Sequence, residues 1–182
     1  MKIKIGVMGS SEKINDMTLV RRAREVGKHI ARHNCILVNG ATTGLPDQAA
    51  QGAKEAGGFV LGISPAENMK EHKKRYKLPS KGYDAIIFTG FGFNQRNILN
   101  IRTSDALVFL RGSLGTLNEF TIAFEDGKVI GVLENMGGIS SFFDELIQLT
   151  KKKTGAKIIY EADPKILISR LVKEVKARDS RR

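Results

Sequence analysis

The sequence is poor in several residue types, and each shortage excludes a class of protein. Only one of its 182 residues is cysteine, Cys35, so the chain can form no internal disulfide and has no cysteine cluster to hold a metal. Tryptophan is absent and aromatic residues make up 7 %, which argues against the stacking surfaces that bind single-stranded nucleic acids. No apolar run approaches the roughly 18 residues of a membrane helix, and the N-terminus lacks the apolar stretch of a signal peptide. We therefore expect a cytoplasmic protein without a membrane association.

Three common motifs are also missing. The pattern GxGxxG does not follow the first apolar run, where the chain reads GVMGSSEK, and the second apolar run ends in Asn39 rather than in an acid that could hold a ribose. The patterns GxxxxGK[ST] and GxSxG are absent as well. These absences disfavour NAD binding of the usual kind, a P-loop NTPase and a nucleophile-elbow hydrolase.

The charge is strongly positive and unevenly distributed. The formal net charge is +11, and basic residues gather in residues 69–81 and 151–182; in the second segment they outnumber acidic residues by seven. Such charge forms either a solvated surface or a field that attracts anionic ligands such as nucleotides. A nucleic-acid partner is a weaker alternative, which predicts salt-sensitive binding that is lost when residues 176–182 are deleted. We expect a small anionic molecule as the partner.

Apolar runs and helix-type periods alternate along the chain. We expect strands at 2–8, 35–39, 59–65, 84–90, 106–110, 128–133 and 156–161, and helices at 16–32, 46–56, 95–104, 117–127, 140–153 and 164–178. The basic segment 66–81 is expected to be a loop. Because the strands are continuous apolar runs, helices must cover both faces of their sheet. The alternation predicts an α/β fold, a Rossmann-like doubly wound parallel sheet in a single domain over residues 1–176, followed by a flexible basic tail at 177–182.

Four turns follow expected strands, at residues 9–11, 39–44, 90–96 and 112–116. In an open parallel sheet, ligands bind outside the carboxyl ends of the strands. Glycine lets the backbone approach a ligand, and the free N–H groups at the start of the next helix favour an anion. Any tight turn of this fold needs glycine, so one turn alone is a weak sign, and the prediction of a phosphate site depends on all four. The expected ligand-binding residues are Gly9, Ser10, Gly40, Ala41, Thr43, Gly44, Gly112, Ser113, Leu114, Gly115 and Thr116.

Two charged residues follow neighbouring expected strands. Arg96 and Glu119 are each expected in the first turn of the helix after its strand, so both should lie at the same sheet edge. We expect them to converge on one pocket beside the phosphate site. His29 and His33 have a spacing that can bind a metal, but no third ligand accompanies them, so no metal site is expected.

Residues 111–119 read RGSLGTLNE, and residues 94–110 read NQRNILNIRTSDALVFL. The first segment resembles the signature PGGxGTxxE of the Lonely Guy family, the cytokinin-activating phosphoribohydrolases. Counting back from Asp105 aligns Arg96 with the catalytic arginine of that family, and NGATTGLPD at 39–47 resembles its GGGxxGLM turn. The wider superfamily includes lysine decarboxylase-like proteins and molybdenum cofactor carrier proteins. The resemblance covers residues 2–135 and is strongest at 84–120.

The resemblance implies an N-glycosyl hydrolase. A nucleoside 5′-monophosphate would be cleaved to its base and ribose 5-phosphate, with the phosphate on Gly112, Ser113, Gly115 and Thr116. Glu119 would stabilise positive charge on the ribose and orient the attacking water, and Arg96 would hold the substrate. No cofactor would be required, and a homodimer or higher homo-oligomer would be expected, as in the relatives.

The signature also departs from that family at several positions. Arg111 replaces the proline, Ser113 replaces the second glycine, Ala41 replaces a glycine, and Asn97 replaces the lysine that usually follows the arginine. These departures resemble the carrier-protein branch. The alternative function is therefore a non-catalytic carrier or sensor of a phosphorylated ligand, such as the molybdenum cofactor or AMP.

Overall fold

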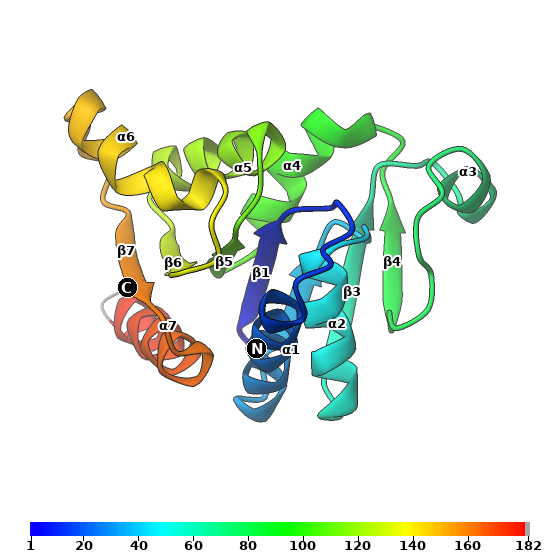
Figure 1. Ribbon diagram of the computed structural model, residues 1–182, viewed down its shortest axis with the longest axis horizontal. Helices are drawn as coiled ribbons and strands as arrows, with labels where there is room; N and C mark the ends of the chain where they lie inside the picture. The colour runs from blue at the N-terminus through cyan, green and yellow to red at the C-terminus, as the bar shows by residue number, and fades with distance from the viewer. Residues whose placement is uncertain (181–182) are drawn as a thin grey trace.

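A parallel sheet of seven strands forms the centre of the computed structural model, which describes residues 1–180 (Figure 1). The strands, in chain order, are β1 (Lys4–Gly9), β2 (Ile36–Asn39), β3 (Phe59–Ser64), β4 (Ala85–Phe88), β5 (Ala106–Leu110), β6 (Val129–Leu133) and β7 (Lys157–Glu161). Their order in the sheet is β4-β3-β2-β1-β5-β6-β7. Every residue of β5 and β6 is buried, as expected of apolar runs covered on both faces.

Helices pack on both faces of this sheet (Figure 1). One face carries α1 (Met17–Arg32), α2 (Leu45–Glu55) and α7 (Pro164–Asp179), and the other carries α4 (Gly92–Thr103), α5 (Leu114–Glu125) and α6 (Phe143–Thr150). Two apolar cores follow from this arrangement. The second contains a cluster of three rings, in which Phe109 meets both Phe120 and Phe143 edge-on. The predicted single-domain, doubly wound α/β fold is confirmed.

The chain reverses its direction across the sheet beside β1. From β1 it proceeds through β2 and β3 to β4, and it then returns by α4 to β5, which pairs with the other side of β1. Gly9, at the end of β1, lies level with Leu110, at the end of β5. The carboxyl ends of β1, β2 and β5 therefore flank the point at which doubly wound sheets bind their ligands.

Several helix boundaries differ from those that the sequence predicts. α4 begins at Gly92 and α5 at Leu114, so Arg96 and Glu119 lie in the second turn of their helices, not in the first. The apolar period does not reveal these starts, because Leu114 is 79 % exposed and Gly92 has a positive φ of 71°. The expected helix at 140–153 is a 3₁₀ turn, Ile139–Phe142, followed by α6.

The expected loop at 66–81 contains a short helix, α3 (Met69–Lys74). Its six residues are too few to show a period. The side chain of Asn68 caps the helix by accepting a hydrogen bond from the backbone of Glu71 at 2.9 Å. His72 is fully buried, with its two ring nitrogens 2.8 Å from the Ser64 hydroxyl and from the Pro79 carbonyl, and it fastens α3 to β3.

The C-terminal helix α7 was expected at 164–178 and continues to Asp179. Residues 181–182 of the predicted basic tail lie outside the described residues. Within residues 1–180, no helix has both the length and the apolar character that crossing a membrane requires.

Candidate functional site

A cavity of about 280 Å³ opens at the carboxyl edge of the sheet, beside the reversal point. Four segments that are far apart in the sequence form its walls: the end of β1 with the loop that follows it, the β2–α2 loop with the start of α2, and the first two turns of α4 and of α5. Its lining residues are Val7, Met8, Gly9, Ser10, Ser11, Glu12, Gly40, Thr42, Pro46, Phe93, Asn94, Arg96, Asn97, Ser113, Gly115, Thr116 and Glu119. We call it the edge cavity.

Arg96 is the cation of the edge cavity, and it is buried without a partner. Its side chain comes from α4, is 5 % exposed and lies over the ring of Phe93, with 5.8 Å from the guanidinium carbon to the ring centroid. Among the described residues, none forms an ion pair or hydrogen bond with the guanidinium, and its Nε is fully buried without an acceptor. Burial lowers the pKa of Arg96, and the charge of Glu119 opposes that change. An unpaired buried charge is unfavourable, so an anionic ligand would relieve it.

The backbone of Gly40 makes room for this guanidinium. A Cβ atom at residue 40 would collide with the terminal nitrogens of Arg96. The φ of Gly40 is not in the left-handed region, so the turn itself does not require glycine here. The residue is instead small enough to leave space for a side chain from α4. A larger residue at this position would have to displace Arg96.

Glu119 is the carboxyl group of the edge cavity that lies deepest. It is 8 % exposed, and its Oε1 accepts a hydrogen bond from Nδ2 of Asn100 at 3.2 Å. Burial raises the pKa of Glu119 to about 7, while the charge of Arg96 and the Asn100 hydrogen bond act in the opposite direction. A carboxyl group that titrates near neutral pH can accept or release a proton under ordinary conditions.

The first turn of α5 contributes backbone donors. Ser113 is the residue before the helix, and its side chain forms no capping hydrogen bond. The first N–H groups of any helix have no acceptor within the helix and form an anion site. A Cβ atom at Gly115 would meet nothing within 4 Å, so the backbone of this turn is open to the cavity.

Eight of the thirteen residues that the sequence singles out line the edge cavity; they are Gly9, Ser10, Gly40, Arg96, Ser113, Gly115, Thr116 and Glu119. The other five lie outside it; they are Ala41, Thr43, Gly44, Gly112 and Leu114.

Each of these five residues has another position or contact. Ala41 is fully buried, and its N–H donates to Asn39 Oδ1 at 2.9 Å. The Thr43 hydroxyl donates to a backbone carbonyl of the β1–α1 loop at 2.6 Å, and Gly44 precedes the first residue of α2. The Gly112 carbonyl accepts a hydrogen bond at 3.0 Å from the turn that follows β6, and Leu114 is exposed to solvent.

Two buried asparagines on α4 were not among the predicted site residues. Asn97 donates from Nδ2 to Asn118 Oδ1 at 3.0 Å, and Asn100 reaches Glu119. Together they join α4 to α5 and set Arg96 relative to Glu119. The spacing of Asn100 could have indicated its role. It lies four residues after Arg96, so the two side chains are on the same face of the helix.

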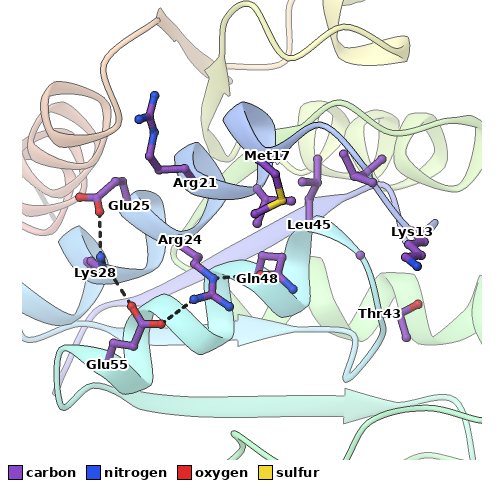
Figure 2. A pocket seen from close by; sticks show the side chains of 13 residues that line it. Lys13, Met17, Arg21, Arg24, Glu25, Lys28, Thr43, Leu45, Gln48 and Glu55 are labelled. Carbon is purple, nitrogen blue, oxygen red and sulfur yellow. Dashed lines mark hydrogen bonds and ion pairs between the residues drawn. The ribbon is translucent and has the colours of Figure 1, made fainter.

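A second, larger hollow of about 740 Å³ lies between α1 and α2 (Figure 2). We call it the α1–α2 groove; its lining residues are Lys13, Ile14, Met17, Val20, Arg21, Arg24, Glu25, Lys28, Thr43, Gly44, Leu45, Gln48 and Glu55. Figure 2 shows Lys28 between Glu25 and Glu55, and Arg24 bound to Gln48 and Glu55. Within the described chain, no group of three or more His, Cys, Asp or Glu residues is placed to hold a metal.

Comparison with known proteins gives one family and several relatives. Residues 2–168 match the SLOG cluster4 family. An uncharacterized protein of Archaeoglobus fulgidus is 34 % identical over 132 residues, which are 72 % of this chain and 80 % of that protein. The cytokinin riboside 5′-monophosphate phosphoribohydrolase of Mycobacterium tuberculosis is 32 % identical over 110 residues, which are 60 % of this chain and 56 % of that enzyme.

Among solved structures, the molybdenum cofactor carrier protein of Chlamydomonas reinhardtii has a similar fold, with a TM-score of 0.77. The two sequences are 30 % identical, and the match covers 97 % of this chain and 99 % of the other.

Proposed function

Since the chain belongs to the SLOG cluster4 family, within the superfamily of Lonely Guy enzymes and molybdenum cofactor carriers, we propose that its edge cavity binds a nucleoside 5′-monophosphate and hydrolyses the N-glycosidic bond. The observation that carries this proposal is Arg96, a buried guanidinium on the cavity wall that has no hydrogen-bond or ion-pair partner among residues 1–180. A phosphorylated ligand supplies the negative charge and the acceptors that this side chain lacks. The similarity to a phosphoribohydrolase supports the same class of ligand.

The edge cavity offers two kinds of anion contact. The open first turn of α5, with Gly115 and Thr116, provides backbone N–H groups for the 5′-phosphate. Arg96 provides a charged donor from α4, which also lines the cavity. The two groups hold the nucleotide at two points, and its ribose then lies beside Glu119.

Glu119 has the position and the acidity for the chemical step. During hydrolysis the C1′–N bond breaks, its electron pair goes to the base, and the base takes up a proton. A water oxygen bonds to C1′ and loses a proton. The Glu119 carboxylate stabilises the positive charge that develops on the ribose, and it accepts a hydrogen bond from the attacking water.

A non-catalytic carrier of a phosphorylated ligand is the second candidate. It is favoured by the match to the molybdenum cofactor carrier protein over 97 % of the chain. It is also favoured by the altered signature, in which Arg111 replaces the proline. Arg111 donates a hydrogen bond to the Met136 carbonyl at 3.1 Å and does not line the edge cavity. In a carrier, Arg96 and the α5 turn hold the ligand and Glu119 has no chemical role.

One experiment separates the two candidates. The purified protein and its Glu119→Gln variant are incubated with AMP, adenine is measured by chromatography, and AMP binding is measured by calorimetry. Adenine release that falls about 100-fold or more in the variant supports the hydrolase. Binding is also measured for a phosphorylated pterin, and tight binding of either molecule without product supports the carrier. Absence of adenine release, and of binding to AMP and to the pterin, shows that both proposals are wrong.

Two further expectations from the sequence remain predictions: a cytoplasmic location, and assembly into a homodimer or larger homo-oligomer. Size-exclusion chromatography with light scattering tests the second.

A further inference from the structure

The carboxyl group of Glu119 has a neighbour that neither the family signature nor the predicted site includes. Asn100 is fully buried on α4, and its Nδ2 lies 3.2 Å from Glu119 Oε1. The same nitrogen lies 3.9 Å from the sulfur of Met8, at the floor of the edge cavity. The other atom of the amide, Oδ1, is buried and has no hydrogen-bond partner in the described chain.

An unsatisfied amide oxygen beside an acid is unusual, because buried polar groups nearly always find a partner. A leucine would fill a similar volume without that cost. A half-turn of the amide exchanges Nδ2 and Oδ1, so that asparagine can either donate to a carboxylate or accept from a protonated carboxyl group. Asn100 is therefore able to bond to Glu119 whether or not the acid carries its proton.

The second oxygen of Glu119 is free. Oε1 is engaged by Asn100, and Oε2 has no hydrogen-bond partner among residues 1–180. Glu119 lines the edge cavity, so this second oxygen is available to a ligand or a water. One side of the carboxyl group is held by the protein and the other is left for chemistry.

We propose that Asn100 is the positioning residue of Glu119: it holds Oε1 in both protonation states, so that Oε2 stays directed to the ligand throughout a proton transfer. The expected effect of Asn100 on catalysis rests on the proposed hydrolase function. Its hydrogen bond to Glu119, and the effect of that bond on the Glu119 pKa, do not. Asn100 itself does not line the cavity.

The other charges around Glu119 are few. The edge cavity has two further ionisable side chains, Arg96 from α4 and Glu12 from the β1–α1 loop. Burial raises the pKa of Glu119 to about 7, and Arg96 and then Asn100 act against that rise. Removing the Asn100 donor should therefore raise this pKa further, while Arg96 and Glu12 stay in place.

The test measures Glu119 directly, by the ¹³C chemical shift of its carboxyl carbon in the labelled full-length protein, titrated from pH 4 to pH 10. The signal is identified by its loss in Glu119→Gln. In Asn100→Leu, which removes both amide atoms, we expect the pKa of Glu119 to rise by about one, because the hydrogen bond that the amide donates to the ionised acid is stronger than the one it accepts from the protonated acid. In Asn100→Asp, a second carboxyl group shares the site, and a larger rise is expected.

Ser104→Ala is the matched control. The Ser104 hydroxyl donates to the Asn100 backbone carbonyl at 2.8 Å and is as deeply buried, but it does not reach Glu119. Its loss should weaken the same helix end and leave the titration of Glu119 unchanged. If Asn100→Leu fails to fold, Asn100→Asp decides, because it keeps the shape of the side chain. Titration of Glu119 at its wild-type pH in the folded variants would overturn the proposal.

Adenine release from AMP gives the second readout. If Glu119 works as a carboxylate, a rise of its pKa by one lowers kcat at pH 7 about five-fold in Asn100→Leu, and the loss largely disappears at pH 9. A loss of equal size at both pH values points to a merely structural effect and contradicts a positioning role. If the wild type releases no adenine, the hydrolase proposal is wrong, and the ¹³C titration alone decides on Asn100.

Discussion

The α1–α2 groove and the edge cavity both contain arginine side chains, but these differ in their hydrogen-bond and ion-pair partners. In the groove, Arg24 reaches Gln48, Gln51 and Glu55 at distances between 2.6 and 3.0 Å. In the edge cavity, Arg96 is more deeply buried and has no such partner in the described chain. The groove is also the larger hollow, about 740 Å³ against about 280 Å³.

The larger hollow is therefore not the one that contains the arginine without a partner in the described chain. A folded protein gains nothing from a buried, unpaired guanidinium, because desolvation of a charge is unfavourable. A surface network of paired charges, by contrast, has its charges satisfied within the protein and contributes little to stability. From this contrast we infer that the groove belongs to the scaffold and that the edge cavity is the better candidate for a ligand site.

The largest effect is expected for Arg96→Gln. Truncation of a buried charged donor should weaken AMP binding by about 1,000-fold, since such a contact contributes on the order of 4 kcal/mol. Without ligand, the same change removes an unpaired buried charge and should increase the free energy of unfolding. Calorimetry and urea denaturation measure the two effects.

The two readouts for Arg96→Gln should therefore move in opposite directions, with a weaker ligand contact and a more stable apo protein. A variant that loses stability and keeps its affinity for AMP would show that Arg96, like Arg24, stabilises the fold and does not bind the ligand.

Glu119 should make the stability of the protein depend on pH. Its pKa is raised from 4.5 to about 7, so the native state keeps a proton that the unfolded state has lost between these values. The free energy of unfolding contributed by this group should therefore fall as the pH rises from 4.5 to 7, by about 3 kcal/mol. The variant Glu119→Gln cannot titrate and should lack this slope.

Urea denaturation at several pH values measures the difference between variant and wild type. We expect the difference to grow in favour of the variant by about 3 kcal/mol over this interval. Parallel curves for the two proteins would mean that the pKa of Glu119 is the same in the folded and the unfolded protein, so that burial does not raise it.

Gly40→Ala should change the position of the Arg96 guanidinium without preventing the protein from folding. The added methyl group collides with the end of a flexible side chain, Arg96, and not with backbone atoms. The fold should tolerate it, and AMP binding should weaken about ten-fold because the guanidinium moves away. The matched control is Gly57→Ala, which lies in a turn of positive φ with nothing within 4 Å.

For the control we expect the reverse pattern, a loss of stability with unchanged binding, because alanine is strained at a positive φ. If Gly40→Ala binds AMP as tightly as the wild type, then the position of Arg96 is not set by this turn.

The sequence predicts the sheet, its helices and the meeting of Arg96 with Glu119, because continuous apolar runs and glycine turns determine which strand ends share an edge. It does not predict which way each turn faces. Gly44 and Thr43 face the α1–α2 groove because the Leu45 N–H bonds to the Ser10 carbonyl at 2.9 Å, and this loop-to-loop contact has no sequence pattern. The spacing of Asn100 from Arg96 places both on one face of α4, but the contact of Asn100 with Glu119 depends on the packing of α4 against α5, which the sequence does not predict.

The smallest effect is expected in the groove, for Arg24→Gln. The Arg24–Glu55 pair joins α1 to α2 at 2.9 Å, but its side chains are 37 % and 43 % exposed, so water and salt screen the attraction. Lys28 also remains 3.5 Å from Glu55 and keeps that acid paired. The free energy of unfolding should fall by about 0.5 kcal/mol, and less in 1 M salt, with AMP binding unchanged. Denaturation at two salt concentrations and calorimetry measure this. A loss of affinity comparable to that of Arg96→Gln would instead indicate that the larger hollow is the binding site. Arg24 would then leave its partner Glu55 in order to bind the ligand.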